Sequence, residues 1–167
     1  DPEMSRGLGD VYKRQTIIFT AYCIATHDIT IGLIEVFSFL LIRKYCGGYH
    51  CQSSTACLIF SAIILIVMAC LSSFIKPSLY MFIALIIADM ELIIKGPVIS
   101  VNHSVSDSEK KYYHRCLIGI LAVFNIIIIA ATVLHLYRIA SCISIVIIFC
   151  FISHIACMTE KNRKLYY

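Results

Sequence analysis

The sequence predicts an all-α protein, a polytopic transmembrane helical bundle with four clear spans preceded by one or two short N-terminal helices. Composition is the first observation behind this prediction: 60% of the 167 residues are hydrophobic and only 14% are charged, whereas soluble domains average about 45–50% apolar and about 25% charged residues. A soluble globule with so few charges would leave a large apolar surface in water. The second observation is that the apolar residues occur in runs comparable in length to the thickness of a bilayer.

The composition also excludes other classes of protein. A disordered chain needs low hydrophobicity. The net charge of +4 is divided among segments between apolar runs and forms no basic stripe, so we expect no binding to nucleic acid. The partner that the composition predicts is a lipid bilayer.

Three segments are expected along the chain. Residues 1–15 are polar and lack the apolar core of a signal peptide, and we expect them to be a non-native leader. Residues 16–160 form a single membrane-embedded domain. Residues 161–167 form a basic cytoplasmic tail.

The apolar runs predict the helices in order. Runs 16–26 and 29–42 hold about 11 and about 14 residues, too few to cross a membrane separately, so they form either one kinked helix or a shallow hairpin. Each of the four longer runs predicts one span: 56–75, 79–94, 117–136 and 139–158. The proline- and glycine-containing breaks at 76–78 and 95–97 end helices, as such residues commonly do.

The distribution of lysine and arginine predicts the orientation of the spans. Segments 43–55 and 95–116 and the C-terminal tail each carry more than one such residue, whereas the turns near 76 and 138 carry one each. Because cytoplasmic segments are enriched in Lys and Arg, we expect the richer segments to face the cytoplasm. Cysteines in segment 43–57 would then be reduced thiols.

Most of the nine cysteines are expected to be small hydrophobic side chains inside the bundle. Five lie within apolar runs: Cys23, Cys70, Cys142, Cys150 and Cys157. Cys46, Cys51 and Cys57 differ, because they share one polar segment, residues 43–57, with His50.

This segment predicts a nucleophilic cysteine. If Ser54 caps the helix of run 56–75, Cys57 falls in its first turn, where free N–H groups and the helix dipole favour a thiolate and could also bind an oxyanion. His50 precedes Cys57 by about 10.5 Å of continuous helix, so it can assist Cys57 only from a non-helical turn. The pair Gly47-Gly48 permits such a turn.

Other interpretations of the segment stay open. Cys46, His50, Cys51 and Cys57 are soft or borderline metal ligands, but they contain no C-x-x-C pair and match no usual zinc spacing, so we expect no metal and no cofactor. A Cys and a His this close also occur by chance. A small metal or solute transporter and a non-catalytic membrane scaffold are therefore the alternative functions.

The segment resembles the signature of the accessory gene regulator B family. The matching pattern is Arg-x-x-x-Gly-Gly-Tyr-His followed seven residues later by Cys, and it falls on Arg43, Gly47, Gly48, Tyr49, His50 and Cys57. A second, weaker match is Gly96-Pro97-Val98 followed by Ser108-Glu109-Lys110-Lys111. The resemblance covers about residues 17–160, and the amphipathic stretch usual before the first helix is replaced by residues 1–15.

The resemblance implies a membrane cysteine endopeptidase that processes quorum-sensing propeptides in Gram-positive bacteria. Cys57 would be the nucleophile and His50 the general base, and the substrate would be a short propeptide with an amphipathic N-terminal helix. Cleavage near its C-terminal end would leave an acyl-thioester on Cys57, and an internal Cys or Ser of the propeptide would then close a thiolactone or lactone ring. A homodimer is compatible with this activity.

Supporting roles are assigned to several neighbours of the catalytic pair. Gln52 and Ser53 are candidate oxyanion donors, although Ser53 also suits a helix cap. Arg43 would bind a propeptide carboxylate bidentately or anchor the helix end at the headgroups. The tail lysines and Lys110 and Lys111 would face anionic headgroups.

Placing an ionisable residue within an apolar membrane run costs free energy, so we expect such residues to have a function. Glu35, Asp89 and Glu91 are the acids of this kind, the last two near a helix end where water can reach them. His135 and His154 lie near the ends of spans, and we expect both at the membrane interface.

Overall fold

The computed structural model describes residue 17 and the ranges 29–46, 54–97 and 107–165. These ranges contain five helices and no strand, which confirms the predicted all-α class for the described part of the chain. The helices are α2 (Ile29–Cys46), α3 (Ser54–Phe74), α4 (Leu79–Lys95), α5 (Asp107–Val133) and α6 (Tyr137–Leu165). The choice between a kinked helix and a hairpin for run 16–26 falls outside the described residues.

The prediction of four clear spans is corrected to two among the described residues. Ser108–Val133 and Tyr137–Thr159 are long and apolar enough to cross a membrane, whereas the apolar stretch Ile59–Phe74 of α3 is shorter. Helix α4 has 17 residues, about 26 Å of rise against a hydrocarbon thickness of about 30 Å. The breaks that the sequence shows on both sides of α4 are the reason for its short length.

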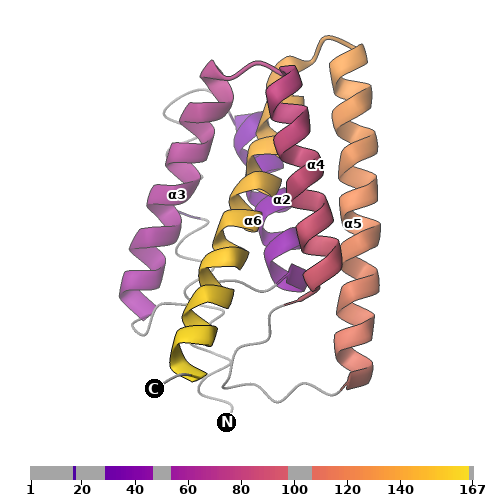
Figure 1. Ribbon diagram of the computed structural model, residues 1–167. Helices are drawn as coiled ribbons and strands as arrows, with labels where there is room; N and C mark the ends of the chain where they lie inside the picture. The colour runs from indigo at the N-terminus through magenta and orange to yellow at the C-terminus, as the bar shows by residue number, and fades with distance from the viewer. Residues whose placement is uncertain (1–16, 18–28, 47–53, 98–106, 166–167) are drawn as a thin grey trace.

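Helix α6 is the centre of the bundle. It packs against all four other helices, and Figure 1 shows it running through the middle, with α3 on one side, α4 and α5 on the other, and α2 behind. The outward faces of the surrounding helices carry many exposed large hydrophobic side chains. Such a surface suits lipid, because soluble monomers rarely expose large apolar patches.

Buried small residues occur on both helices of the α2–α6 pair, the most extensive helix pair in the bundle. Gly32 and Ser38 of α2 and Ala140, Ser141 and Ser144 of α6 are all buried. Small residues allow helix backbones to approach closely in a membrane bundle. The hydroxyl of Ser144 donates to the carbonyl oxygen of Ala140 at 2.8 Å, so burying it leaves no unsatisfied donor.

The helices alternate in direction and therefore place their ends in two groups. The first group, called the site end, contains the last turn of α2, the start of α3, the end of α4 and the start of α5 (Figure 1). The Tyr45 and Tyr113 rings, 5.9 Å apart, join α2 to α5 there. The second group, called the turn end, contains the connections 75–78 and 134–136, where Arg138 donates to the Ser73 hydroxyl at 3.2 Å.

Helix α4 has well-defined caps at both ends. The Ser78 hydroxyl accepts a hydrogen bond from the Met81 backbone N–H at 3.4 Å, as an N-cap serine does. Gly96 ends the helix with φ 66° and ψ −170°, and its N–H donates to the carbonyl oxygen of Leu92. This combination of angles is essentially restricted to glycine.

The backbone of Gly96 predicts a sensitive substitution. Gly96→Ala forces a Cβ into this conformation, and the new carbon would lie 3.6 Å from the His114 ring. We expect a loss of about 1–3 kcal/mol in the free energy of unfolding, measured by reversible unfolding in mixed detergent micelles.

Gly119→Ala is the matched control. Gly119 lies within α5, and nothing is within 4 Å of its added Cβ, so alanine should stabilise the helix by about 0.5–1 kcal/mol. Equal destabilisation by the two variants would contradict the role assigned to the Gly96 conformation.

Candidate active site

The described residues include two of the candidate site residues. Arg43 lies in the last turn of α2, and Cys57 is the fourth residue of α3. The other candidates fall outside the described residues, and their roles stay predictions: Gly47, Gly48, Tyr49, His50, Gln52 and Ser53. The same holds for Cys51.

The position of Cys57 is the main feature of this site. Helix α3 begins at Ser54, which places Cys57 in the first helical turn. The first four N–H groups of a helix have no partner within it, and the N-terminal end carries a partial positive charge. Both effects stabilise an anion, so this backbone geometry is compatible with a cysteine thiolate.

Arg43 packs along its own helix. Its guanidinium carbon lies 5.4 Å from the centre of the Phe39 ring one turn earlier, within the range of a cation–π interaction. The side chain is half-buried. This arrangement favours the anchoring role that the sequence assigns to Arg43 as one of two options.

Aromatic side chains gather at the site end. The Tyr45 ring is 5.9 Å from Tyr113, which is 5.9 Å from Tyr112, and the Lys44 ammonium lies 5.4 Å from the Tyr45 ring centre. Tyrosine is enriched where a membrane protein meets the headgroups. The site end of the bundle therefore has the composition of a membrane–water interface.

Two histidines hold the end of α4. His114 of α5 donates from Nε2 to the carbonyl oxygen of Ile93 at 2.8 Å, and His154 of α6 donates from Nε2 to the carbonyl oxygen of Gly96 at 2.9 Å. The last carbonyl groups of a helix lack partners within it. The two side chains thus tie the Gly96-Pro97 element to α5 and α6.

The side chain of His154 is buried within the protein, and its interfacial position stays a prediction. It is 0% exposed, because α6 turns this residue towards the end of α4. Its Nδ1 has no hydrogen-bond partner among the described residues. His135 is exposed in the α5–α6 turn, with a ring nitrogen 2.6 Å from the Tyr137 hydroxyl, and its interfacial position likewise stays a prediction.

The three acids of the apolar runs have different surroundings. Asp89 accepts a hydrogen bond from the Asn125 amide at 2.8 Å, a contact between α4 and α5. Glu91 forms a partly exposed ion pair of 2.9 Å with Lys95. Asn125 is a residue that sequence reasoning missed, although it is the polar interruption of run 117–136.

Glu35 is the most deeply buried of these acids. Its side chain is 0% exposed, and Cys142 Sγ lies 4.0 Å from its Oε2. Its Oε1 has no partner among the described residues. Because Glu35 precedes Cys46 by about 16 Å of helix, it belongs to the α2–α6 contact and not to the site end.

The metal interpretation gains no support from the described part of the chain. That part holds no group of three or more His, Cys, Asp and Glu side chains that could bind a metal ion. Cys46 is completely buried within the hydrophobic core, as expected of a cysteine that acts as a small apolar side chain. His50 and Cys51, the other proposed ligands, lie outside the described residues.

Two helices apolar enough to cross a membrane and many exposed hydrophobic side chains among the described residues are the features of a membrane protein. The chain belongs to the accessory gene regulator B family, which it matches over residues 8–155. No curated protein and no solved structure matches the chain. Family membership implies a role in propeptide processing for the agr quorum-sensing system.

His154 should contribute to stability through its hydrogen bond to Gly96. His154→Leu leaves the buried Gly96 carbonyl without this donor, and we expect a loss of about 1–3 kcal/mol in the free energy of unfolding. His154→Gln retains an N–H donor at a similar reach and should recover part of the loss. Unfolding in detergent micelles measures both, and equal destabilisation by the two variants would contradict a role for the hydrogen bond.

Proposed function

We propose that the protein is a membrane-embedded cysteine endopeptidase that cleaves the C-terminal part of a short autoinducer propeptide. The observation that carries the proposal is the position of Cys57 in the first turn of α3, at the residue where the family signature has its cysteine. The motif supplies His50 seven residues earlier. Membership of the family supplies the class of substrate.

The proposed reaction begins with proton transfer from the Cys57 thiol to His50. The thiolate attacks a backbone carbonyl of the propeptide, and the negative charge that develops on the carbonyl oxygen is stabilised by free N–H groups at the start of α3. Gln52 and Ser53 are candidate additional donors. The C–N bond then breaks, His50 protonates the leaving amine, and an acyl-thioester remains on Cys57.

Ring closure completes the proposed reaction. A Cys or Ser inside the propeptide attacks the thioester, forms a thiolactone or lactone, and returns the Cys57 thiol. Exchange of one thioester for another is nearly isoenergetic, so hydrolysis would compete unless water is kept from the intermediate. A site at the edge of a membrane bundle suits this requirement.

The substrate and the membrane define the remaining contacts in this proposal. The amphipathic helix of the propeptide would lie in the interface, beside the tyrosines of the site end. Gly47, Gly48 and Tyr49 would shape the turn that carries His50, and Arg43 would anchor α2 or bind a propeptide carboxylate. No cofactor is required, and a homodimer is compatible with the scheme.

We further propose that the protein is a multi-pass protein of the cell membrane with its site end in the cytoplasm. The support is that segments 43–55 and 95–116 are rich in Lys and Arg, and that the helix ends which border them, those of α2, α3, α4 and α5, lie at the same end of the bundle (Figure 1). The two turns with one basic residue each adjoin the other end. This separation is the pattern that orients membrane proteins.

The peptidase proposal predicts complete dependence on two side chains. Cys57→Ala and His50→Ala should each lower propeptide cleavage by about 10³-fold or more, because each removes one half of the nucleophilic pair. Co-expression with the propeptide, followed by mass spectrometry of the products, measures cleavage. Cys70→Ala is the control, since Cys70 lies on the same helix but more than three turns away. Normal cleavage by Cys57→Ala would contradict the mechanism.

The orientation predicts opposite accessibility at the two ends. Lys76→Cys at the turn end should react with a membrane-impermeant maleimide in intact cells, whereas Lys110→Cys at the site end should react only after permeabilisation. Both native side chains are exposed. The unmodified chain is the control and should remain unlabelled in intact cells. The reverse pattern would contradict the proposed orientation.

A further inference from the structure

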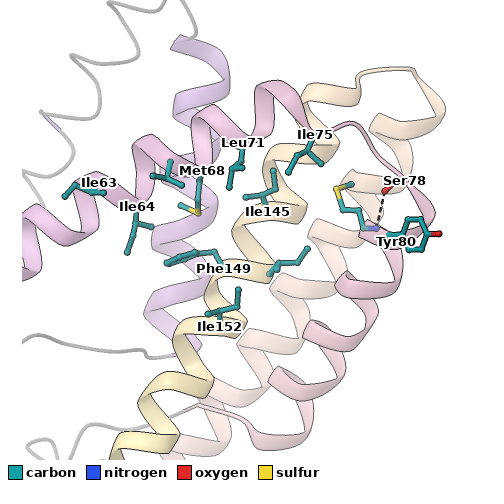
Figure 2. A pocket seen from close by; sticks show the side chains of 13 residues that line it. Ile63, Ile64, Met68, Leu71, Ile75, Ser78, Tyr80, Ile145, Phe149 and Ile152 are labelled. Atoms are coloured by element: carbon teal, nitrogen blue, oxygen red, sulfur yellow. Dashed lines mark hydrogen bonds between the residues drawn. The ribbon is translucent and has the colours of Figure 1, made fainter.

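An apolar groove lies between α3 and α4, with α6 as its floor. Figure 2 shows side chains from the three helices facing this space, and its volume is about 490 Å³. Helices α3 and α4 are consecutive, yet within the described residues each packs mainly on α6 rather than on the other. The groove follows from this splayed arrangement.

Hydrocarbon side chains form the walls of the groove. On α6, Ile145, Ile148, Phe149 and Ile152 line one helical face, and α3 supplies residues from Ile63 to Leu71. The polar lining groups belong to Ser78 and Tyr80 at the turn end, where Figure 2 shows the Ser78 hydroxyl bonded to the start of α4. An occupant must therefore be apolar along most of its length and polar only at that end.

The length of the groove corresponds to one leaflet of a bilayer. Its lining extends along the chain from Ile63 to Ile75, about 18 Å at the rise of an α-helix. Half of a hydrocarbon core of about 30 Å is about 15 Å. Tyr80 is 83% exposed at the turn end, where an interfacial tyrosine is expected.

Positive charge adjoins the same end of the groove. Lys76 is exposed in the connection between α3 and α4, and the Arg138 guanidinium reaches α3 by donating to Ser73 at 3.2 Å. A negative headgroup at this level would meet these two cations while its acyl chain followed the apolar lining. The charge and the hydrophobic pattern thus point to the same orientation of an occupant.

We propose that this groove binds one acyl chain of an anionic phospholipid, with the phosphate at Lys76 and Arg138. The site differs from the Cys57 site in position, since its polar lining groups lie at the turn end, and in chemistry, since it needs no reactive group. Burial of each CH₂ group that the groove takes up favours binding over an exposed position, and the ion pair selects the headgroup. The lipid would fill the space that α3 and α4 leave between them.

The test uses the full chain reconstituted in phosphatidylcholine vesicles that contain phosphatidylglycerol with a photoactivatable diazirine in one acyl chain. After irradiation, peptide mapping by mass spectrometry should find the label on the groove-facing residues of α3 and α6. Ile148→Trp fills the groove and should lower this labelling at least about fivefold. Ile126→Trp is the matched control, because Ile126 is 66% exposed on α5 and does not line the groove.

A second variant tests the headgroup without disturbing the packing. Lys76→Gln should lower the preference of the labelled groove for phosphatidylglycerol over phosphatidylcholine by about two- to fivefold, the size expected for an exposed ion pair. Because Lys76 lies in an exposed turn, the Lys76→Gln variant remains informative if Ile148→Trp does not fold. Cys57→Ala should bind the lipid normally, which separates this proposal from the peptidase proposal.

Three results would overturn the proposal. Equal labelling of the groove and the outer face of α5 would show ordinary boundary lipid only. Cross-links from Leu71→Cys to a second chain would assign the groove to a dimer contact. Cross-links from Leu71→Cys to residues 18–28 of the same chain would assign it to the N-terminal part of the protein.

Discussion

The close contact between α2 and α6 is the constraint on which the other helix positions depend. Both helices carry small buried residues, which permit close approach of helix backbones, and α6 also packs against α3, α4 and α5. Because α6 is surrounded, Ser141, Ser144 and His154 on it are buried. Ser144 and His154 have carbonyl partners, whereas the Ser141 hydroxyl has none among the described residues.

The bundle holds its two ends in different ways. At the site end, two histidines connect α4 to α5 and to α6, and a pair of tyrosines connects α2 to α5. At the turn end, where the connection 75–78 joins α3 to α4, Arg138 of α6 donates to the Ser73 hydroxyl of α3, and α3 and α4 splay apart from there towards the site end (Figure 1). The proposed chemistry lies at the end that these histidines and tyrosines connect, and the polar end of the proposed lipid groove lies at the other.

The polar side chains within the bundle differ in whether they lie near the start of α3, where the proposed active site is. Asp89 has a partner on a neighbouring helix, and Glu35 lies inside the α2–α6 contact, so neither is placed near the start of α3. Cys46 lies in the hydrophobic core at the site end, whereas Cys57 lies in a helical first turn. The two cysteines differ in their position in a helix, Cys46 in the last turn of α2 and Cys57 in the first turn of α3.

Local properties of the chain were enough to predict the helical class, the positions of the breaks and the helix start before Cys57, because hydropathy, glycine, proline and capping residues act over a few neighbours. The family signature is also local. The tertiary structure decided which helix is central, that His154 is buried, that Asp89 pairs with Asn125 and that α3 and α4 enclose a groove. These features depend on contacts between residues far apart in sequence. A run of apolar residues shows that a helix is apolar, but it does not show which neighbouring helix each face contacts.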